Sequence, residues 1–335
     1  MEHSMISDDE QPSRVPAVSR RTLLQGAGEA ALAASLTVAG RAQADTASSE
    51  ARAVPARRFE GRVALITGGA RGQGRAHAVR LASEGASVVL CDILEQIPTV
   101  EYPLASQADM DETVGLIRAA GGRCLAIKAD VRNPRAAADA VDRTIKEFGK
   151  LDILLANAGI LGSAPLKEIS DQAFEDIVRT NLFGVFNLMR SAIPPMEARR
   201  TGRIVVTASQ AGRMGFAQGA HYAASKWGAI GLVKSAALEL AKSGITVNAV
   251  CPTSVNTPMV NNPPAWRRLL AGDPAPTREK FEAKMREHPM LPQGVPWVEP
   301  DDVSDAVLFL ASDAAQHITG SVIDIQAGAA ASNIA

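Results

Sequence analysis

The sequence predicts an α/β fold with a single doubly wound parallel sheet, and three features of residues 58–335 point to it. Short apolar runs of strand length alternate with helical runs along this whole region. The strand runs are apolar throughout, which indicates a sheet covered by helices on both faces. No internal repeat and no break in composition divides the region, so we expect one folded domain.

Each expected element has its own boundary signals, because Gly, Pro and Asp flank the apolar runs. The expected strands are 62–69, 86–92, 123–131, 151–159, 202–209, 245–253 and 321–328. The expected helices are 73–85, with a glycine stop at Gly85, then 134–149, 171–199, 220–244 and 300–313. Two connections, 93–112 and 257–299, are longer than the fold requires, and long loops after parallel strands are usually functional.

The composition excludes several classes of function. The formal net charge is −1, so the chain has no electrostatic footprint for nucleic acid and no basic patch for a membrane surface. The three cysteines, Cys91, Cys124 and Cys251, form neither a CxxC motif nor a cluster with metal-ligand spacing. We therefore expect no metal site and no disulfide framework.

Residues 1–57 differ from the rest and are expected to lie outside the folded domain. A pair of arginines, Arg20 and Arg21, precedes a weakly apolar run that ends in the A-x-A pattern of residues 42–44. This outline resembles a twin-arginine export signal, and the run is too short and too polar to span a membrane. It favours export to the periplasm or cell envelope, and a disordered extension on a cytoplasmic protein is the alternative.

The stretch TGGARGQG, residues 67–74, follows a strand and opens a helix, which is the setting of a phosphate-binding turn. Glycines in such a turn let the backbone approach a pyrophosphate, and the helix start offers it free N–H groups. Asp92 ends the next strand, where a carboxylate accepts the ribose hydroxyls of NAD and repels the 2′-phosphate of NADP. Arg71 in the turn weakly favours NADP, whereas Asp92 followed by the apolar Ile93 favours NAD.

A tyrosine and a lysine, Tyr222 and Lys226, lie one helical turn apart in the stretch HYAASK. A phenol titrates near 10 in water, and we expect the Lys226 ammonium to lower the pKa of Tyr222 toward neutrality. Tyr222 would then act as a general base toward an alcohol, while Ser209 holds the substrate oxygen. His221 is an alternative base, but its offset by one residue directs it elsewhere on the helix.

The glycine spacing G-x-x-x-G-x-G, the NAG of 157–159, Ser209 and the pair Tyr222 and Lys226 together resemble the short-chain dehydrogenase/reductase family, over about 59–335. The resemblance implies a Rossmann-like fold and a catalytic set of Asn181, Ser209, Tyr222 and Lys226, in which Asn181 helps to orient Lys226 through water. It also implies that the cofactor contacts are Gly68, Arg71, Gly72, Gln73, Gly74, Asp92, Ile93, Asp130, Val131, Asn157, Gly159, Tyr222, Lys226, Pro252, Val255 and Thr257. Among them, Asp130 and Val131 would hold the adenine, and Thr257 would bond the carboxamide.

Four segments further resemble the mycofactocin-coupled, carveol-dehydrogenase-like branch of that family: GQGRAHAVRLASEGA, NLFGVFN, PTSVNTPM and the insertion after Asp92. The resemblance implies that residues 94–106 cover a tightly held NAD, which an external, mycofactocin-like redox carrier reoxidises in place. Residues 258–299 are expected to form a substrate lid.

The expected lid and the stretch 213–219 are rich in large apolar side chains, so we expect an apolar secondary alcohol as substrate, such as a cyclic monoterpenoid. These side chains are Met214, Phe216, Trp266, Met285 and Leu291. Arg267 and Arg268 could grip a phosphate or carboxylate instead.

Two other interpretations stay open. The chain could be a short-chain reductase of other carbonyl substrates with freely exchanging NAD(P)H, in which case 94–106 is a plain surface insertion. It could also be a non-catalytic NAD-sensing regulator, although such a protein has no need of Tyr222 and Lys226. We also expect a homo-oligomer, a tetramer or a dimer, built on the long helices near 171–199 and 220–242.

Overall fold

The computed structural model describes residues 57–287 and 294–332. The expected export signal therefore lies outside the described residues, apart from the last residue of 1–57. Leu291, which was expected to face the substrate, also lies outside them, as does Met290 of the same segment.

Seven parallel strands form one sheet in the order β3-β2-β1-β4-β5-β6-β7. The strands are β1 (Val63–Thr67), β2 (Ser87–Asp92), β3 (Cys124–Lys128), β4 (Ile153–Ala156), β5 (Gly202–Thr207), β6 (Ile245–Pro252) and β7 (Val322–Ile325). All seven expected strands are present, and the predicted doubly wound fold is confirmed. Because the strand order reverses between β1 and β4, a crevice opens at the carboxyl ends of these two strands.

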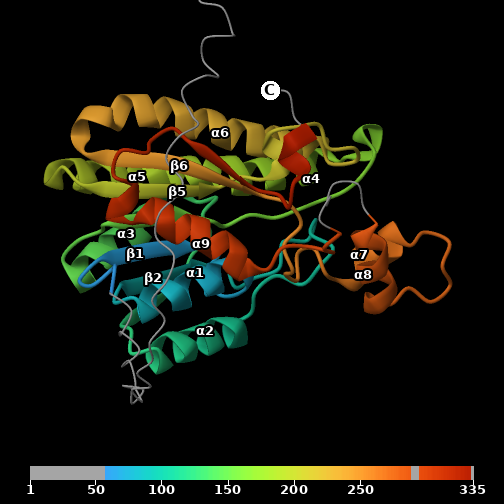
Figure 1. Cartoon of the computed structure of the whole chain (residues 1–335), viewed down its shortest axis with the longest axis horizontal. Coiled ribbons are helices and arrows are strands. Elements are labelled where there is room, and N and C mark those ends of the chain that lie inside the picture. Colours follow the sequence, from blue (N-terminus) through green and yellow to red (C-terminus); the bar gives the residue numbers. More distant parts are fainter. Residues whose placement is uncertain (1–56, 288–293, 333–335) are drawn as a thin grey trace, which may run out of the picture. The chain divides into compact units, whose positions relative to one another are not determined.

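Helices cover both faces of the sheet, as Figure 1 shows. The helices are α1 (Gly72–Ser83), α2 (Gln107–Ala119), α3 (Pro134–Phe148), α4 (Asp171–Val178), α5 (Gly184–Arg199), α6 (Ala220–Leu240), α7 (Pro263–Leu269), α8 (Arg278–Arg286) and α9 (Pro300–Ala311). Buried side chains of α1, α2 and α9 pack on one face, and those of α3, α5 and α6 pack on the other. The uniformly apolar strands fit this arrangement, because each strand residue meets a helix on one side or the other.

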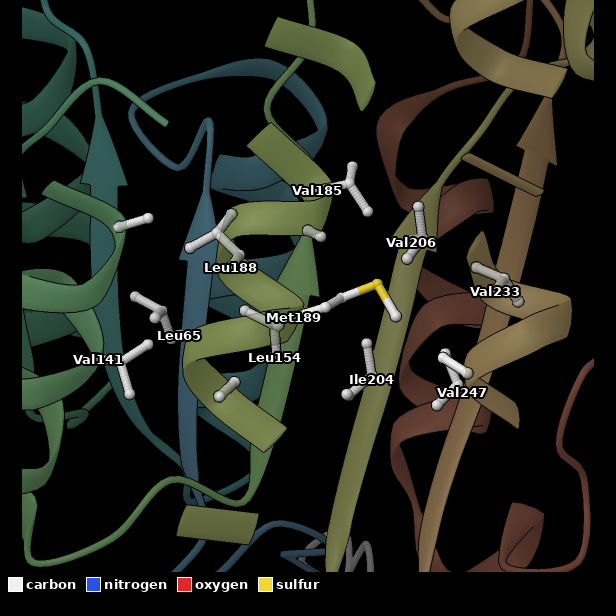
Figure 2. Close-up of a cluster of buried hydrophobic side chains, with 14 of the residues drawn as sticks. Leu65, Val141, Leu154, Val185, Leu188, Met189, Ile204, Val206, Val233 and Val247 are labelled. Atoms are coloured by element: carbon white, nitrogen blue, oxygen red, sulfur yellow. The ribbon is translucent and has the colours of Figure 1, made fainter. Parts of the chain in front are cut away.

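The core between the sheet and α3, α5 and α6 is built from aliphatic side chains of modest size (Figure 2). Leu188 of α5 and Val233 of α6 lie over the strands, and neither is more than 1% exposed. The strands supply residues such as Leu154 and Ile204, which are fully buried. This packing holds β4 and β5 rigidly, so the loops at their carboxyl ends have fixed starting points.

The connection after β2 is shorter than expected, because α2 already begins at Gln107 within the segment 93–112. Ser106 and Asp109 form a capping box in which the Ser106 N–H donates to Asp109 Oδ2 at 2.7 Å and the Asp109 N–H donates to Ser106 Oγ at 3.2 Å. The sequence carries this signal as Ser-x-x-Asp, and its omission explains the wrong boundary. What remains without regular structure is the stretch 93–106.

Two other expected segments contain detail that the sequence did not indicate. The expected helix 171–199 is interrupted by a π-helical turn, Arg179–Phe183, between α4 and α5. The segment 257–299 contains α7 and α8, whose seven and nine residues are too few for a clear periodic pattern. Among the described residues, no helix has the length and apolar character needed to cross a bilayer.

Candidate active site

The turn after β1 has the backbone geometry of a phosphate cradle. Gly68 and Gly72 adopt left-handed φ angles of +64° and +57°, which residues with a side chain rarely adopt. A Cβ on Gly74 would lie 2.0 Å from the carbonyl oxygen of Gly68, so only glycine lets α1 pack this closely on the loop. The N-terminus of α1 therefore faces the crevice, where its N–H groups and dipole favour an anion.

Asp92 ends β2 beside this loop and is 9% exposed. Its Oδ2 accepts a hydrogen bond from the backbone N–H of Ala70 at 3.1 Å. Burial raises the pKa of Asp92, while hydrogen bonds from backbone N–H groups lower it. Asp92 lines the crevice together with Ile93, Asp130 and Val131, where the sequence placed the ribose and adenine contacts.

The expected adenine contact Asp130 is held by a chain of hydrogen bonds that extends to α4. Arg132 donates from Nε to both carboxylate oxygens of Asp130, at 2.8 and 3.1 Å, and from Nη1 to Asp176 at 2.8 Å. Thr99, in the stretch after β2, donates to the other oxygen of Asp176 at 2.8 Å. The chain joins the adenine end of the crevice to the expected cofactor cover.

Asn157 follows β4 and lines the crevice, but its side chain mainly fixes the phosphate turn. Its Nδ2 donates to the carbonyl oxygens of Thr67 at 3.0 Å and Gly68 at 3.3 Å, and its Oδ1 accepts from Thr207 Oγ1 at 3.1 Å. Asn157 thus ties the end of β1 to the ends of β4 and β5, so the phosphate turn and the catalytic strand keep a fixed relation.

Ser209, Tyr222 and Lys226 meet where the end of β5 adjoins the start of α6. The side chains of Ser209 and Tyr222 are hydrogen-bonded to each other. The Nζ of Lys226 donates to the carbonyl oxygen of Thr207 at 2.7 Å and lies 5.7 Å from the centroid of the Tyr222 ring. The structure therefore brings together the three side chains that the sequence assigned to catalysis.

The protein's own residues do not lower the pKa of Tyr222 toward neutrality, so the expected effect of Lys226 is wrong. Burial raises the pKa of Tyr222 above its ordinary value of 10.0, and the hydrogen bond with Ser209 opposes this with a smaller effect. Burial also lowers the pKa of Lys226 to about 8. Both charged forms are disfavoured in this desolvated site, so a further positive charge beside the phenol is needed to make it acidic.

Asn181 lies in the π-helical turn and is fully buried. Its side chain accepts from the N–H of Ile160 at 2.8 Å and donates to the Ile160 carbonyl at 2.9 Å and to Ser225 Oγ at 3.1 Å. A Cβ on Gly159 would lie 3.2 Å from Asn181 Oδ1 and 3.5 Å from Lys226 Nζ, so both side chains approach the same glycine. Asn181 thus positions the segment after β4, close to Lys226.

Two adjoining cavities open at the carboxyl ends of the strands. The nucleotide cavity is lined by the phosphate turn and by Asp92 and Asp130. The catalytic cavity, of about 380 Å³, has Ser209, Tyr222 and Lys226 in its wall. Both cavities share the wall residues Gln73, Asn157, Gly159, Thr257 and Met259. A ligand that fills the first cavity therefore borders the catalytic side chains in the second.

Most expected contact residues line one of these cavities. Those of the nucleotide cavity are Gly68, Arg71, Gly72, Gln73, Asp92, Ile93, Asp130, Val131, Asn157, Gly159 and Thr257, and the catalytic cavity adds Ser209, Tyr222, Lys226, Pro252 and Val255. Gly74 and Asn181 lie behind the walls, where they position the loops. His221 is 2% exposed and lies beside Gly162, away from the catalytic cavity, as the sequence predicted.

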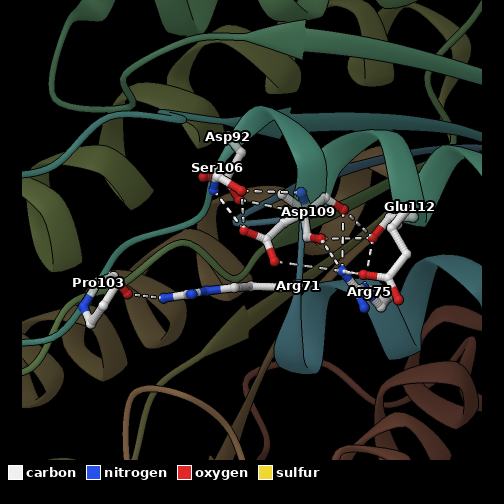
Figure 3. Close-up of polar contacts among 9 residues, drawn as sticks. Arg71, Arg75, Asp92, Pro103, Ser106, Asp109 and Glu112 are labelled. Carbon is white, nitrogen blue, oxygen red and sulfur yellow. Dashed lines mark hydrogen bonds and ion pairs between the residues drawn. The ribbon is translucent and has the colours of Figure 1, made fainter. Parts of the chain in front are cut away.

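The cover segment, residues 94–106, contacts the phosphate turn (Figure 3) and is also stabilised by hydrogen bonds within the segment. Arg71 donates to the carbonyl oxygen of Pro103, so this arginine contacts the cover. Gln96 ties the segment together, because its amide bonds the backbone of Ile97, Val100, Tyr102 and Leu104. At its end, Ser106 starts α2, which Arg75 of α1 holds through Glu112 at 2.8 Å. The cover segment is thus anchored at both ends.

The lid, residues 258–299, has a small core of its own. Phe281 and Trp297 stack with their ring centroids 6.4 Å apart, and Met285 and Ala265 are buried with them. Phe281 and Met285 also line the catalytic cavity, as do Met214 and Phe216.

Two lid residues do not lie where the sequence placed them. Trp266 does not line the catalytic cavity, because its indole turns to Asn261 and donates to it at 2.9 Å. Of the two arginines, Arg268 lines the cavity and Arg267 does not.

Sequence reasoning missed several wall residues. Leu161 and Met259 line the catalytic cavity, and the carbonyl oxygen of Thr207 holds Lys226. Tyr102 of the cover segment lines the nucleotide cavity and accepts a hydrogen bond from the N–H of Leu161. A signal for Tyr102 was available, because the chain has 2 tyrosines and this one falls in an insertion next to the expected cofactor.

The nucleotide cavity fits a dinucleotide by observations of its own. Its phosphate turn has left-handed glycines at the start of a helix, and a carboxylate, Asp92, lies in the wall beside that turn. Gln73 Oε1 is buried without a hydrogen-bond partner among the described residues, and a ligand can satisfy such an acceptor. Among the described residues, no group of His, Cys, Asp and Glu could hold a metal ion.

Known proteins resemble the chain over most of its length. It is 44% identical over 274 residues to the (−)-trans-carveol dehydrogenase of Rhodococcus erythropolis, an alignment that covers 81% of this chain and 98% of the relative. The crystal structure of carveol dehydrogenase from Mycobacterium avium in complex with NAD superposes with a TM-score of 0.79 at 39% identity and covers 81% of this chain and 98% of that one. A short chain dehydrogenase from Mycobacterium paratuberculosis bound to NAD superposes with a TM-score of 0.72 at 38% identity, again over 81% and 98%.

The family model described as short chain dehydrogenase matches residues 62–268, which include the phosphate turn and all four expected catalytic residues. These residues, the sheet order and the two adjoining cavities agree with the family predicted from the sequence. The chain is therefore a member of the short-chain dehydrogenase/reductase family.

Proposed function

We propose that this chain is an NAD-dependent alcohol dehydrogenase that acts on an apolar secondary alcohol, with Tyr222 as general base. The observation that carries the proposal is the position of Ser209, Tyr222 and Lys226 in an apolar cavity that shares a wall with the nucleotide cavity. A substrate bound there has its carbinol next to the phenol and borders the bound cofactor.

NAD is the cofactor that the residues fit. Asp92 offers a carboxylate where the ribose hydroxyls of NAD are recognised, and the same carboxylate repels a 2′-phosphate. Two solved relatives are bound to NAD, in agreement with the sequence prediction. When bound, NAD accepts the hydride from the carbinol carbon, and its oxidised nicotinamide carries a positive charge.

In the reaction, each catalytic side chain has one task. Ser209 donates a hydrogen bond to the substrate oxygen and holds it beside Tyr222. Tyr222 takes the hydroxyl proton as the alcohol is oxidised, and it returns a proton to the carbonyl oxygen in the reverse direction. Lys226, whose pKa burial lowers to about 8, exchanges protons readily near neutral pH, and its ammonium lies 5.7 Å from the centroid of the Tyr222 ring.

The substrate class follows from the walls of the catalytic cavity. Met214, Phe216, Met259, Phe281 and Met285 give it a mainly apolar surface. Among the described lining residues only Lys226 and Arg268 carry charge, and Arg268 is paired with Glu101 at 3.4 Å. A cyclic monoterpenoid alcohol suits such a cavity, and the relative from Rhodococcus erythropolis is named for a carveol substrate.

The anchored cover segment supports the proposal that NAD is held tightly and reoxidised in place by an external, mycofactocin-like carrier. Arg71 holds it at Pro103, and Asp176 of α4 holds it at Thr99. A protein with a bound cofactor would also suit export after folding, which is the role proposed for residues 1–57.

The exposed apolar side chains of α5 and α6 support the proposal of a homo-oligomer, either a tetramer or a dimer. Trp227 is 52% exposed and Leu238 is 83% exposed on α6, and Phe186 is 40% exposed on α5. These helices are the ones on which the sequence analysis placed the subunit contact.

The test is an assay in which the alcohol reduces NAD and the NADH formed reduces an artificial electron acceptor. The reduction of that acceptor is followed for wild type and Tyr222→Phe. We expect Tyr222→Phe to lower kcat by roughly 10²–10⁴-fold, because general acid–base transfer contributes about that much. NAD binding, measured by equilibrium dialysis, should change little. Equal activity of the two proteins, or activity on small charged hydroxy acids and none on terpenoid alcohols, would contradict the proposal.

A further inference from the structure

We propose that Tyr102 is a further cofactor-binding residue, whose phenolic O–H donates a hydrogen bond to an oxygen in the nicotinamide half of the bound dinucleotide. The inference rests on the proposed function, because it concerns the same NAD site. Tyr102 belongs to the cover segment, outside the motifs that define the family. The inference follows from the burial of Tyr102, its one hydrogen bond and its neighbours.

The hydroxyl of Tyr102 is a buried donor. The side chain lines the nucleotide cavity, and the residue is 6% exposed. Its oxygen accepts a hydrogen bond from the N–H of Leu161 at 3.0 Å, which fixes the place of the hydroxyl. Among the described residues, no acceptor takes the O–H itself. A buried O–H without an acceptor is unfavourable, so the cavity offers this donor to a ligand.

The neighbours of Tyr102 place the donor near the reacting end of the site. The ring packs in one apolar cluster with Ile160, Met259 and Tyr222. On the other side, the guanidinium of Arg71 reaches the carbonyl of Pro103, the next residue along the chain (Figure 3). Tyr102 is therefore close to the catalytic phenol and adjoins the residue that contacts the phosphate turn.

The adenine contact Val131 packs outside that cluster. Asp92 ends β2 and Asp130 lies two residues after β3, and of the two apolar contacts next to them Ile93 packs in the cluster around Tyr102 and Val131 does not. A donor close to the catalytic phenol meets the nicotinamide-side phosphate or ribose and not the adenine. The bulk of the ring also seals the cavity wall, so the bond forms in a desolvated place where it is strong.

One hydroxyl then serves both cavities. It holds the N–H of Leu161, whose side chain lines the catalytic cavity, and it donates to the dinucleotide in the nucleotide cavity. Loss of the hydroxyl should therefore weaken the binding of the cofactor and also raise the KM of the alcohol. The kcat at saturating substrate should change less.

The experiment measures the dissociation constants of NAD, ADP-ribose and 5′-AMP by equilibrium dialysis, for wild type and Tyr102→Phe. ADP-ribose keeps both phosphates and both riboses, whereas 5′-AMP lacks the nicotinamide half. We expect Tyr102→Phe to raise the dissociation constants of NAD and ADP-ribose by about 10–100-fold, as for one hydrogen bond to a charged oxygen. The dissociation constant of 5′-AMP should change by less than about twofold.

Thr99→Val is the matched control, because it removes a hydroxyl of the same cover segment that faces Asp176. This variant should raise the dissociation constants of NAD, ADP-ribose and 5′-AMP by the same small factor. Equal weakening of 5′-AMP and ADP-ribose by Tyr102→Phe would mean that Tyr102 acts only by holding the cover, and would overturn the proposal. NAD binding by Tyr102→Phe within about twofold of wild type would overturn it as well. If wild type that has been freed of any NAD it carries binds none of the ligands, the proposed function fails instead.

Discussion

The cover segment and the lid both follow strands at the same edge of the sheet, yet they are held in different ways. The cover has no regular secondary structure. It is fixed by directed polar contacts, namely Gln96 to its own backbone, Arg71 to Pro103 and Thr99 to Asp176, together with an apolar cluster around Ile97, Val100 and Tyr102. The lid folds into α7 and α8 around the buried Phe281, in an apolar cluster that also contacts Ala327.

The difference matches what each segment faces. A dinucleotide is the same molecule in every catalytic cycle, and directed hydrogen bonds can hold one fixed shape well. Hydrophobic contacts have no preferred direction, so a hydrophobic lid suits an apolar alcohol and tolerates variation in the shape of that alcohol. We therefore expect changes in the cover to alter cofactor affinity and changes in the lid to alter the KM of the alcohol.

The largest effect should come from the lid core. Phe281→Ala removes a ring that is 3% exposed and stacked on Trp297, and such truncations cost roughly 3–5 kcal/mol. We expect the KM of the alcohol to rise by about 10²-fold or more, while the dissociation constant of NAD stays within about twofold. Steady-state kinetics and equilibrium dialysis measure the two quantities, and a parallel loss of NAD affinity would remove the distinction.

The matching change for the cover is Asp176→Ala, which removes the α4 side chain that holds Thr99. This carboxylate is buried and accepts hydrogen bonds from Thr99 and Arg132, so its loss leaves a partly buried guanidinium without that partner, at a cost of roughly 3 kcal/mol. We expect the dissociation constants of NAD and 5′-AMP to rise together by about tenfold or more. The KM of the alcohol, measured at saturating NAD, should be nearly unchanged, and a rise confined to KM would contradict the account.

The smallest effect should come from the ion pair between the two segments. Glu101 of the cover lies 3.4 Å from Arg268 of the lid, and their side chains are 65% and 39% exposed. Exposed pairs contribute about 1 kcal/mol or less, so Glu101→Gln should change both NAD affinity and KM by less than about fivefold. A large joint loss of both would show that cover and lid move as one unit.

Much of this site could be predicted from the sequence because its signals are local. The glycines of 67–74 are imposed by left-handed backbone and close packing, and the spacing of Tyr222 and Lys226 is one turn of a helix. The apolar strands fixed the fold class for the same reason, since each needs a helix on both sides. These features depend on neighbours in the chain, which a single sequence displays.

What the sequence could not supply are contacts between distant segments. The bond from Leu161 to Tyr102 spans 59 residues, and the one from Thr99 to Asp176 spans 77. Desolvation is also collective, so the raised pKa of Tyr222 follows from all the residues that bury it and not from its lysine. Trp266 shows the same limit, because only the folded lid reveals that its indole faces Asn261.

The central claim is that Tyr222 becomes an acid of useful strength once NAD fills the adjoining cavity. The chain has 2 tyrosines, so protein labelled with ¹³C at the tyrosine ζ carbon gives two resonances, and Tyr222→Phe assigns them. In the free protein the pKa of Tyr222 should lie above 10.0. With NAD bound it should fall by about 1–3 pH units, since the positive nicotinamide favours the phenolate, and NAD should accordingly bind more tightly as the pH rises. A pKa of Tyr222 that stays the same or rises when NAD binds would contradict the account.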